Sequence, residues 1–164
     1  MRIERTGAKE MLTYWNGRFA DFAERISARV ESGVEECWLL FDEDSNRWIG
    51  ELHIRWDKPD QPEEANGVDT ACLEAFRIDE AFQGRHLGTM LMRRCLERIR
   101  ERGFTRATIG ADDSDPKLGV MYQNWGFTRR VREDSFDYHD DEGNLIHDTY
   151  VLYANDDVQH TGLK

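Results

Sequence analysis

The sequence predicts a mixed α/β fold in which one sheet has helices on both faces. Three observations support this. Apolar runs of strand length alternate with segments that have helical periodicity, a glycine-containing turn joins a strand to a long helix, and two strand-like runs close the chain. With 164 residues, 39% of them hydrophobic, the chain is expected to form a single domain over residues 1–164.

Apolar periodicity defines the elements that precede the glycine-containing turn. Between Ala8 and Ser32 apolar residues recur every three to four positions, and the pair Asn16-Gly17 divides this segment into two helices. A later segment with two prolines and an Asn-Gly pair has the composition of a mobile loop. In chain order we expect a strand at 1–6, helices within 8–32, a hairpin of strands at 37–41 and 48–56, and the loop at 57–69.

The second half of the chain has clearer boundaries. Apolar residues at helical spacing begin at Leu87 and end before Gly103, which is a typical C-terminal glycine. Asp115 followed by Pro116 is typical of a helix N-cap with proline at the first helical position. We therefore expect strands at 73–78, 105–111, 128–133 and 145–153, a helix from 87 to about 102, and a short helix at 116–125.

Composition excludes several classes of protein. The net charge of −11 argues against nucleic-acid binding, since phosphate contacts dominate that affinity. No run approaches 18 apolar residues and the N-terminus lacks an apolar signal segment, so we expect neither membrane insertion nor secretion. The three cysteines lack metal-ligand spacing, which predicts reduced thiols, no metal and a cytoplasmic protein.

The turn at residues 82–89, Phe-Gln-Gly-Arg-His-Leu-Gly-Thr, predicts a phosphate site. Gly84 and Gly88 allow a tight turn, and the first N–H groups of the following helix have no partner within it. Arg85 adds a positive charge, and residues 77–106 contain eight arginines against four acids. A phosphorylated cofactor fits this pattern, whereas the alternative is an ordinary helix start. Neither the P-loop nor the dinucleotide signature is present.

A second motif follows about forty residues later. Residues 122–127, Tyr-Gln-Asn-Trp-Gly-Phe, resemble the Y-x-x-x-G-F segment of the Gcn5-related N-acetyltransferase (GNAT) superfamily. Gln83 and Gly88, with the spacing between them, resemble the acetyl-CoA signature of the same family. The resemblance covers roughly residues 73–127. It implies an acetyltransferase (an acyltransferase) with a central, mostly antiparallel mixed sheet and helices on both faces, and with acetyl-CoA as co-substrate.

The resemblance also implies roles for individual residues. Tyr122 would protonate the departing thiolate, because a phenol with a pKa of about 10 keeps its proton at neutral pH. Asp115 stands where the family often has an asparagine that contacts the cofactor, and helix capping is the alternative role. The pantetheine arm would lie along the backbone of Phe76, Arg77 and Ile78, and the pyrophosphate would bind the amides of Gln83, Gly84, Arg85, His86, Leu87, Gly88 and Thr89.

His86 departs from the family pattern, because it occupies the position of the signature's middle glycine. If the turn needs a left-handed backbone there, a residue other than glycine costs roughly 1–2 kcal/mol. This departure bears on cofactor affinity more than on the fold. The imidazole is expected either to contact a phosphate or to lie exposed or packed.

The reaction needs an unprotonated amine, so a proton acceptor is required. Glu74 is the first candidate, because it lies on the strand beside which the thioester would rest. Asp112, Asp113 or a water relay are alternatives, and the histidines at 53 and 147 are weaker candidates. No cysteine lies in either motif, so direct attack of the amine on the thioester is expected.

The acceptor is expected to be a small molecule or a peptide with a primary amine. Residues 133–164 contain nine acids and one base, Lys164, so an acidic wall would suit a cationic amine, whereas the alternative is a solvated acidic hairpin. A homodimer is possible. A non-catalytic CoA-binding sensor or subunit that keeps the fold is the second functional hypothesis.

Overall fold

The centre of the computed structural model, which describes residues 1–160, is one seven-stranded sheet in the order β1-β2-β3-β4-β5-β7-β6. The β4–β5 pair is parallel and the other described pairs are antiparallel, which confirms the mostly antiparallel mixed sheet. The strands are β1 (Arg2–Thr6), β2 (Glu35–Asp42), β3 (Arg47–Arg55), β4 (Thr70–Ile78), β5 (Arg106–Asp112), β6 (Arg129–His139) and β7 (Leu145–Asn155).

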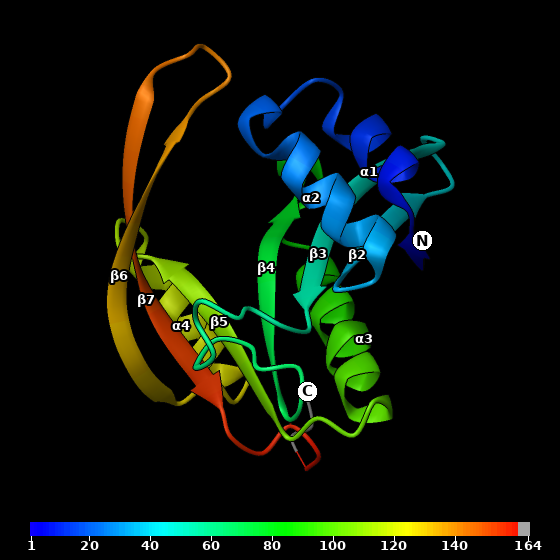
Figure 1. The fold of residues 1–164 in the computed structure, drawn as a ribbon. Coiled ribbons are helices and arrows are strands. Elements are labelled where there is room, and N and C mark those ends of the chain that lie inside the picture. The colour runs from blue at the N-terminus through cyan, green and yellow to red at the C-terminus, as the bar shows by residue number, and fades with distance from the viewer. Residues whose placement is uncertain (161–164) are drawn as a thin grey trace.

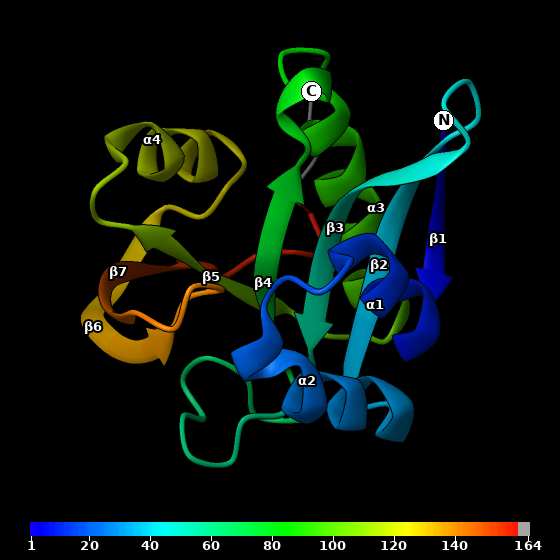
Figure 2. The ribbon, with the colours of Figure 1, turned by 90° about the horizontal axis from the view of Figure 1, so that it is seen from above.

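Helices cover both faces of the sheet, as the sequence predicted. In the view of Figure 2, α1 (Ala8–Trp15) and α2 (Ala20–Ser32) lie on one side, and α3 (Leu87–Glu101) and α4 (Pro116–Asn124) lie on the other. The left-handed Asn16 at the end of α1 separates the first two helices at the predicted position. Within residues 1–160 no helix is long and apolar enough to cross a membrane.

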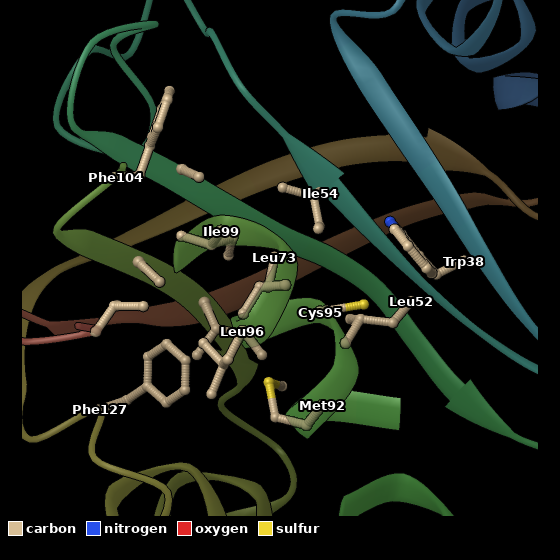
Figure 3. Packing of buried hydrophobic residues seen from close by; sticks show 14 of the residues in the cluster. Trp38, Leu52, Ile54, Leu73, Met92, Cys95, Leu96, Ile99, Phe104 and Phe127 are labelled. Carbon is tan, nitrogen blue, oxygen red and sulfur yellow. The ribbon is translucent and has the colours of Figure 1, made fainter. Parts of the chain in front are cut away.

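The main core lies between α3 and the sheet. Leu91, Met92, Leu96 and Ile99 on one face of α3 have no solvent exposure. Figure 3 shows Met92 and Leu96 among side chains of the sheet and of the segment after α4, including Leu73 and Phe127. The predicted apolar face of this helix is therefore its packing face. All three cysteines of the chain are buried free thiols.

Two neighbouring strands separate in the middle of the sheet. The parallel pairing of β4 with β5 runs only from Thr70 to Leu73, while β4 continues beside β3 to Ile78. An extra residue in β4 shifts the register against β3, and Ala75 there is left-handed, with φ of 55°. Figure 1 shows β4 and β5 diverging above their paired segment. This divergence leaves one edge of the upper half of β4 without a neighbouring strand.

The proline-containing segment after β3 is anchored. Glu64 is 3% exposed and Ala65 is fully buried. The carbonyl oxygen of Glu64 accepts a hydrogen bond from Thr108 Oγ1 at 2.7 Å, and the Asn66 side-chain oxygen accepts from three backbone N–H groups. These contacts fix a segment whose composition predicted mobility.

Candidate functional site

The N-terminus of α3 presents a row of free backbone donors. The N–H groups from Gly84 to Thr89 donate to no acceptor within residues 1–160. Gly84 is left-handed, with φ of 79°, so that the chain turns back toward the helix axis. Buried or partly buried N–H groups need partners, and the helix dipole favours a negative one at this end. The turn is therefore built to bind an anion such as a pyrophosphate.

The backbone of His86 is left-handed, which is the conformation for which the sequence predicted a strain cost. Its φ of 61° and ψ of 16° place it in the region that favours glycine, directly before the first residue of α3. The strain is about 1–2 kcal/mol. The side chain is exposed, and it makes no capping hydrogen bond with the helix that follows.

Two contacts fasten this turn to the end of β4. Gln83 Nε2 donates to the carbonyl oxygen of Ile78 at 2.9 Å. A Cβ atom on Gly88 would lie 3.1 Å from Cζ of Phe76, so the absence of a side chain lets α3 approach β4 closely. The turn and the free edge of β4 thus form one continuous surface, and Phe76, Arg77 and Ile78 all lie on that part of β4.

Tyr122 lies on α4 beside this surface. The residue is 4% exposed, and its ring centre lies 6.5 Å from that of Phe76 and 6.1 Å from that of Trp125. Burial, with a smaller contribution from the charge of Asp115, raises the pKa of Tyr122 to about 12. The phenol therefore keeps its proton at neutral pH. Asp115 caps α4, because its carboxylate accepts a hydrogen bond from Lys117 N at 3.1 Å.

A cleft of about 720 Å³ lies between α2, β4, β5 and the β6–β7 hairpin. The register of the strands explains its lining, since alternate residues of β6 and β7 face the same side. At the hairpin tip, Asp141 accepts a hydrogen bond from Phe19 N at 2.7 Å, and Asp21 accepts one from His139 N at 3.1 Å. The hairpin therefore contacts the helical segment that forms the opposite wall.

Glu74 lies in this cleft with its carboxylate paired. Its Oε1 is 2.8 Å from Lys58 Nζ, and its Oε2 is 3.9 Å from a terminal nitrogen of Arg55. Asp112, at the end of β5, also lines the cleft, whereas Asp113 is exposed and is not part of the lining. The structure thus brings Glu74 and Asp112 to one cleft and leaves Asp113 outside it.

Carboxylates without a cationic partner lie on the wall that β5 and the hairpin form. Neither Asp112 nor Asp148 forms an ion pair with any of residues 1–160, whereas Lys58 pairs with Glu64 and Glu74. Aromatic rings stand beside these two acids. The rings on this wall belong to Phe136, Tyr138 and Tyr150.

A buried charged cluster lies under α1 and α2. His53 Nδ1 is 2.6 Å from Glu35 Oε2, and its Nε2 is 2.7 Å from Glu51 Oε1, with all three side chains at most 1% exposed. Arg77 reaches Glu51 at 3.1 Å, so the cluster also holds a residue of β4. His53 is therefore buried and fully bonded, and His147 is an exposed residue paired with Asp137.

Sequence reasoning missed several residues of the cleft. Lys58 and Glu64 belong to a segment that looked like a plain loop, and nothing local marks them. Phe136 and Tyr138 could have been found, because every second residue from Asp134 to Tyr138 lines the cleft. The acidic composition of that segment hid the alternation, which is why the predicted strand ended at residue 133 rather than at 139.

Comparison with known proteins agrees with this architecture. The family model described as "Acetyltransferase (GNAT) family" matches residues 7–127. The ribosomal-protein-S18-alanine N-acetyltransferase of Escherichia coli has a TM-score of 0.70 and 13% identity, over 98% of this chain and 96% of that one. An acetyltransferase of Elizabethkingia anophelis with acetyl-CoA bound has a TM-score of 0.64 and 17% identity, over 94% and 97%.

A third similar structure is an acetyltransferase of Bacillus subtilis in complex with CoA, with a TM-score of 0.63 and 19% identity over 93% of this chain and 96% of that one. At these identities the structures show a common fold. The search of curated proteins found no significant match.

Proposed function

The chain belongs to the acetyltransferase (GNAT) family, and we propose that it transfers the acetyl group of acetyl-CoA to the primary amine of a cationic small molecule or peptide. One observation supports this above the others. The free N–H groups from Gly84 to Thr89 continue into the unpaired edge of β4, and Tyr122 lies beside that edge. We also infer that residues 1–164 act as one acetyltransferase domain.

The residues present fit acetyl-CoA, which supplies an activated acetyl thioester when bound. The N–H groups of residues 84–89 and the guanidinium of Arg85 would hold the pyrophosphate, whereas Gln83 N already donates to the carbonyl oxygen of Glu80 at 3.2 Å. Backbone groups of Phe76, Arg77 and Ile78 would bind the pantetheine arm as an added strand, because this edge of β4 has no neighbour. Acetyl-CoA and CoA are bound in two of the similar structures, which supports this assignment.

In the proposed mechanism, Tyr122 holds a proton and gives it to the departing thiolate. Glu74 accepts the proton that the acceptor amine must lose, and Asp112 is the second candidate in the same cleft. Cys72 is an unsuitable nucleophile. It is buried, and burial raises the pKa of its thiol, so little thiolate forms. Direct attack by the amine is therefore favoured over an acyl-cysteine intermediate.

The acceptor would enter through the cleft that Glu74 lines. This cleft lies on the α2 side of the sheet, whereas α3 and α4 lie on the other side. Asp112 and Asp148 offer two carboxylates that no described cation neutralises, and Tyr138 and Phe136 offer ring faces beside them. Carboxylates and aromatic faces both attract an ammonium group. We therefore infer that the acceptor carries a positive charge beyond the amine that reacts.

An acceptor series tests this function. Release of CoA is measured with 1,4-diaminobutane, 4-aminobutanol and 4-aminobutyrate, which share chain length and differ in the charge of the second group. The diamine is expected to have the highest kcat/KM. Asp148→Asn should raise the KM for the diamine roughly tenfold, since a hydrogen bond between charged groups contributes about 1.5 kcal/mol and each 1.4 kcal/mol is a factor of about ten.

Asp137→Asn is the matched control, because Asp137 is an exposed carboxylate of the same hairpin that does not line the cleft. No CoA release with any amine, together with a thermal shift on adding CoA, would instead support the non-catalytic CoA-binding sensor or subunit. Equal rates with the diamine and the amino alcohol would contradict the proposed charge recognition but not acetyl transfer.

A further inference from the structure

The acceptor cleft already contains an ammonium group of the protein. Lys58 Nζ lies 2.8 Å from Glu74 Oε1 and 2.7 Å from Glu64 Oε1, and the side chain is 13% exposed. Both carboxylates line the same cleft as Lys58. A primary ammonium held by the proposed base is the arrangement that an acceptor amine must reach before it can react.

Lys58 also lies close to the part of β4 where the acetyl group would arrive. Glu74 directly precedes the left-handed Ala75, and the free edge of β4 begins at this point. The backbone holds the lysine there, since Lys58 N donates to the carbonyl oxygen of Ala65 at 3.0 Å and the segment is anchored beneath it. The amine is therefore positioned by the fold on the face of β4 that the acceptor would use.

We propose that Lys58 is an internal acceptor and that the protein acetylates its own Lys58 Nζ. This inference rests on the proposed function, because the same bound acetyl-CoA and the same Tyr122 would serve the reaction. No second protein molecule is needed, since the lysine and the base share one cleft.

The step balances in atoms and charge. Nζ forms a bond to the acetyl carbon, and the carbon–sulfur bond breaks with its electron pair on sulfur. The ammonium gives up two protons in total. One is released to solvent through Glu74. Tyr122 gives its own proton to the thiolate of CoA, and the second proton of the amine restores the Tyr122 hydroxyl, so that Tyr122 ends unchanged. The products are N-acetyllysine at position 58 and free CoA.

The surroundings of Lys58 would make its acetylation slow, and acetylation would change the charge of the cleft. Burial alone would lower the pKa of Lys58, but its contacts with the carboxylates of Glu74 and Glu64 raise it, so the neutral amine forms rarely. Acetylation removes the ammonium and leaves Glu64 and Glu74 without that partner. The modified cleft would then attract a cationic acceptor more strongly.

Mass spectrometry of the intact chain and its peptides tests the proposal, since the sequence has four lysines, at positions 9, 58, 117 and 164. Purified protein is incubated with isotopically labelled acetyl-CoA, and the rate at each lysine is measured. Lys9 and Lys117 are exposed, so uncatalysed acetylation would favour them over Lys58. We expect label at Lys58 first, with a rate constant that does not change with protein concentration.

Two variants separate catalysis from chemical labelling. Tyr122→Phe should slow labelling of Lys58 by about 10²-fold or more and leave Lys9 and Lys117 unchanged. Lys58→Arg keeps a cation between the two carboxylates and should remove one acetyl group from the labelled mass. The proposal is overturned if external amines are acetylated while Lys58 stays unlabelled, and the proposed function itself fails if neither reacts.

Discussion

Replacing His53 by glutamine should destabilise the protein strongly. Both ring nitrogens lie within 2.7 Å of buried carboxylate oxygens of Glu35 and Glu51, and ionised carboxylates only accept hydrogen bonds. The ring must therefore be protonated on both nitrogens. Burial alone would lower the pKa of His53, but Cys37 and the two carboxylates raise it well above its usual value.

The size of the effect follows from the burial of all three groups. Removing one partner of a buried ion pair costs about 3–5 kcal/mol, because the remaining charge stays buried without compensation. In a domain of this length each kcal/mol lowers the melting temperature by about 2–4 °C. His53→Gln should therefore lower the melting temperature by about 6–20 °C and move the urea midpoint correspondingly.

His147 offers a matched control in the same molecule. It also bonds a carboxylate, with Nδ1 2.5 Å from Asp137 Oδ1, but its side chain is 64% exposed. His147→Gln should change the melting temperature by about 2 °C at most, since surface substitutions have small effects. If both variants lose the same stability, burial does not determine the contribution of the His53 cluster and the reasoning is refuted.

The contribution of His53 should also depend on pH with a defined sign. A raised pKa in the folded state gives stability that is complete below the unfolded pKa of about 6.5. That stability declines by about 1.4 kcal/mol per pH unit above 6.5, until the raised folded pKa is reached. The difference in unfolding free energy between wild type and His53→Gln should therefore shrink from pH 6.5 to pH 8, as urea titrations at each pH would measure.

Three further substitutions test the turn, α3 and α4 residues that are proposed to act on acetyl-CoA. His86→Gly should relieve the left-handed strain and raise stability by up to about 1 kcal/mol, measured by urea unfolding, and a loss of stability would contradict the assigned backbone. Gly88→Val should abolish the thermal shift given by CoA, because its side chain would collide with Phe76, whereas Gly7→Ala should keep it. Tyr122→Phe should lower kcat by about 10²–10⁴-fold with acetyl-CoA affinity unchanged, and equal losses of both would rule out its role as the acid.

The turn and helix proposed to bind acetyl-CoA were predictable from sequence, because the residues that define them are close together in the chain. A turn with two glycines and the helix that follows it lie within about twenty residues, and the orphan N–H groups follow from any helix start. The same is true of the Asp115 cap on α4. The left-handed backbone at His86 was less predictable, since the local pattern allowed both conformations.

The cleft proposed for the acceptor was not predictable in the same way, because segments far apart in the sequence line it. Lys58 meets Glu74 only when the segment after β3 folds across β4. Glu64, which pairs with Lys58, has its backbone carbonyl hydrogen-bonded to Thr108 of β5. Each of these residues alone resembles an ordinary surface charge. Their pairing depends on the register of the sheet, which residue spacing does not reveal.

The acidic C-terminal region shows why position matters more than charge count. Its nine acids suggested a continuous acidic wall, yet the pleat of the hairpin sends alternate side chains to opposite faces. Asp137 faces away from the cleft and pairs with His147, whereas Asp148 lines the cleft without an ion pair among residues 1–160. Recognition of a cationic acceptor would therefore depend on Asp148 and Asp112, and the remaining acids would add only a screened long-range attraction.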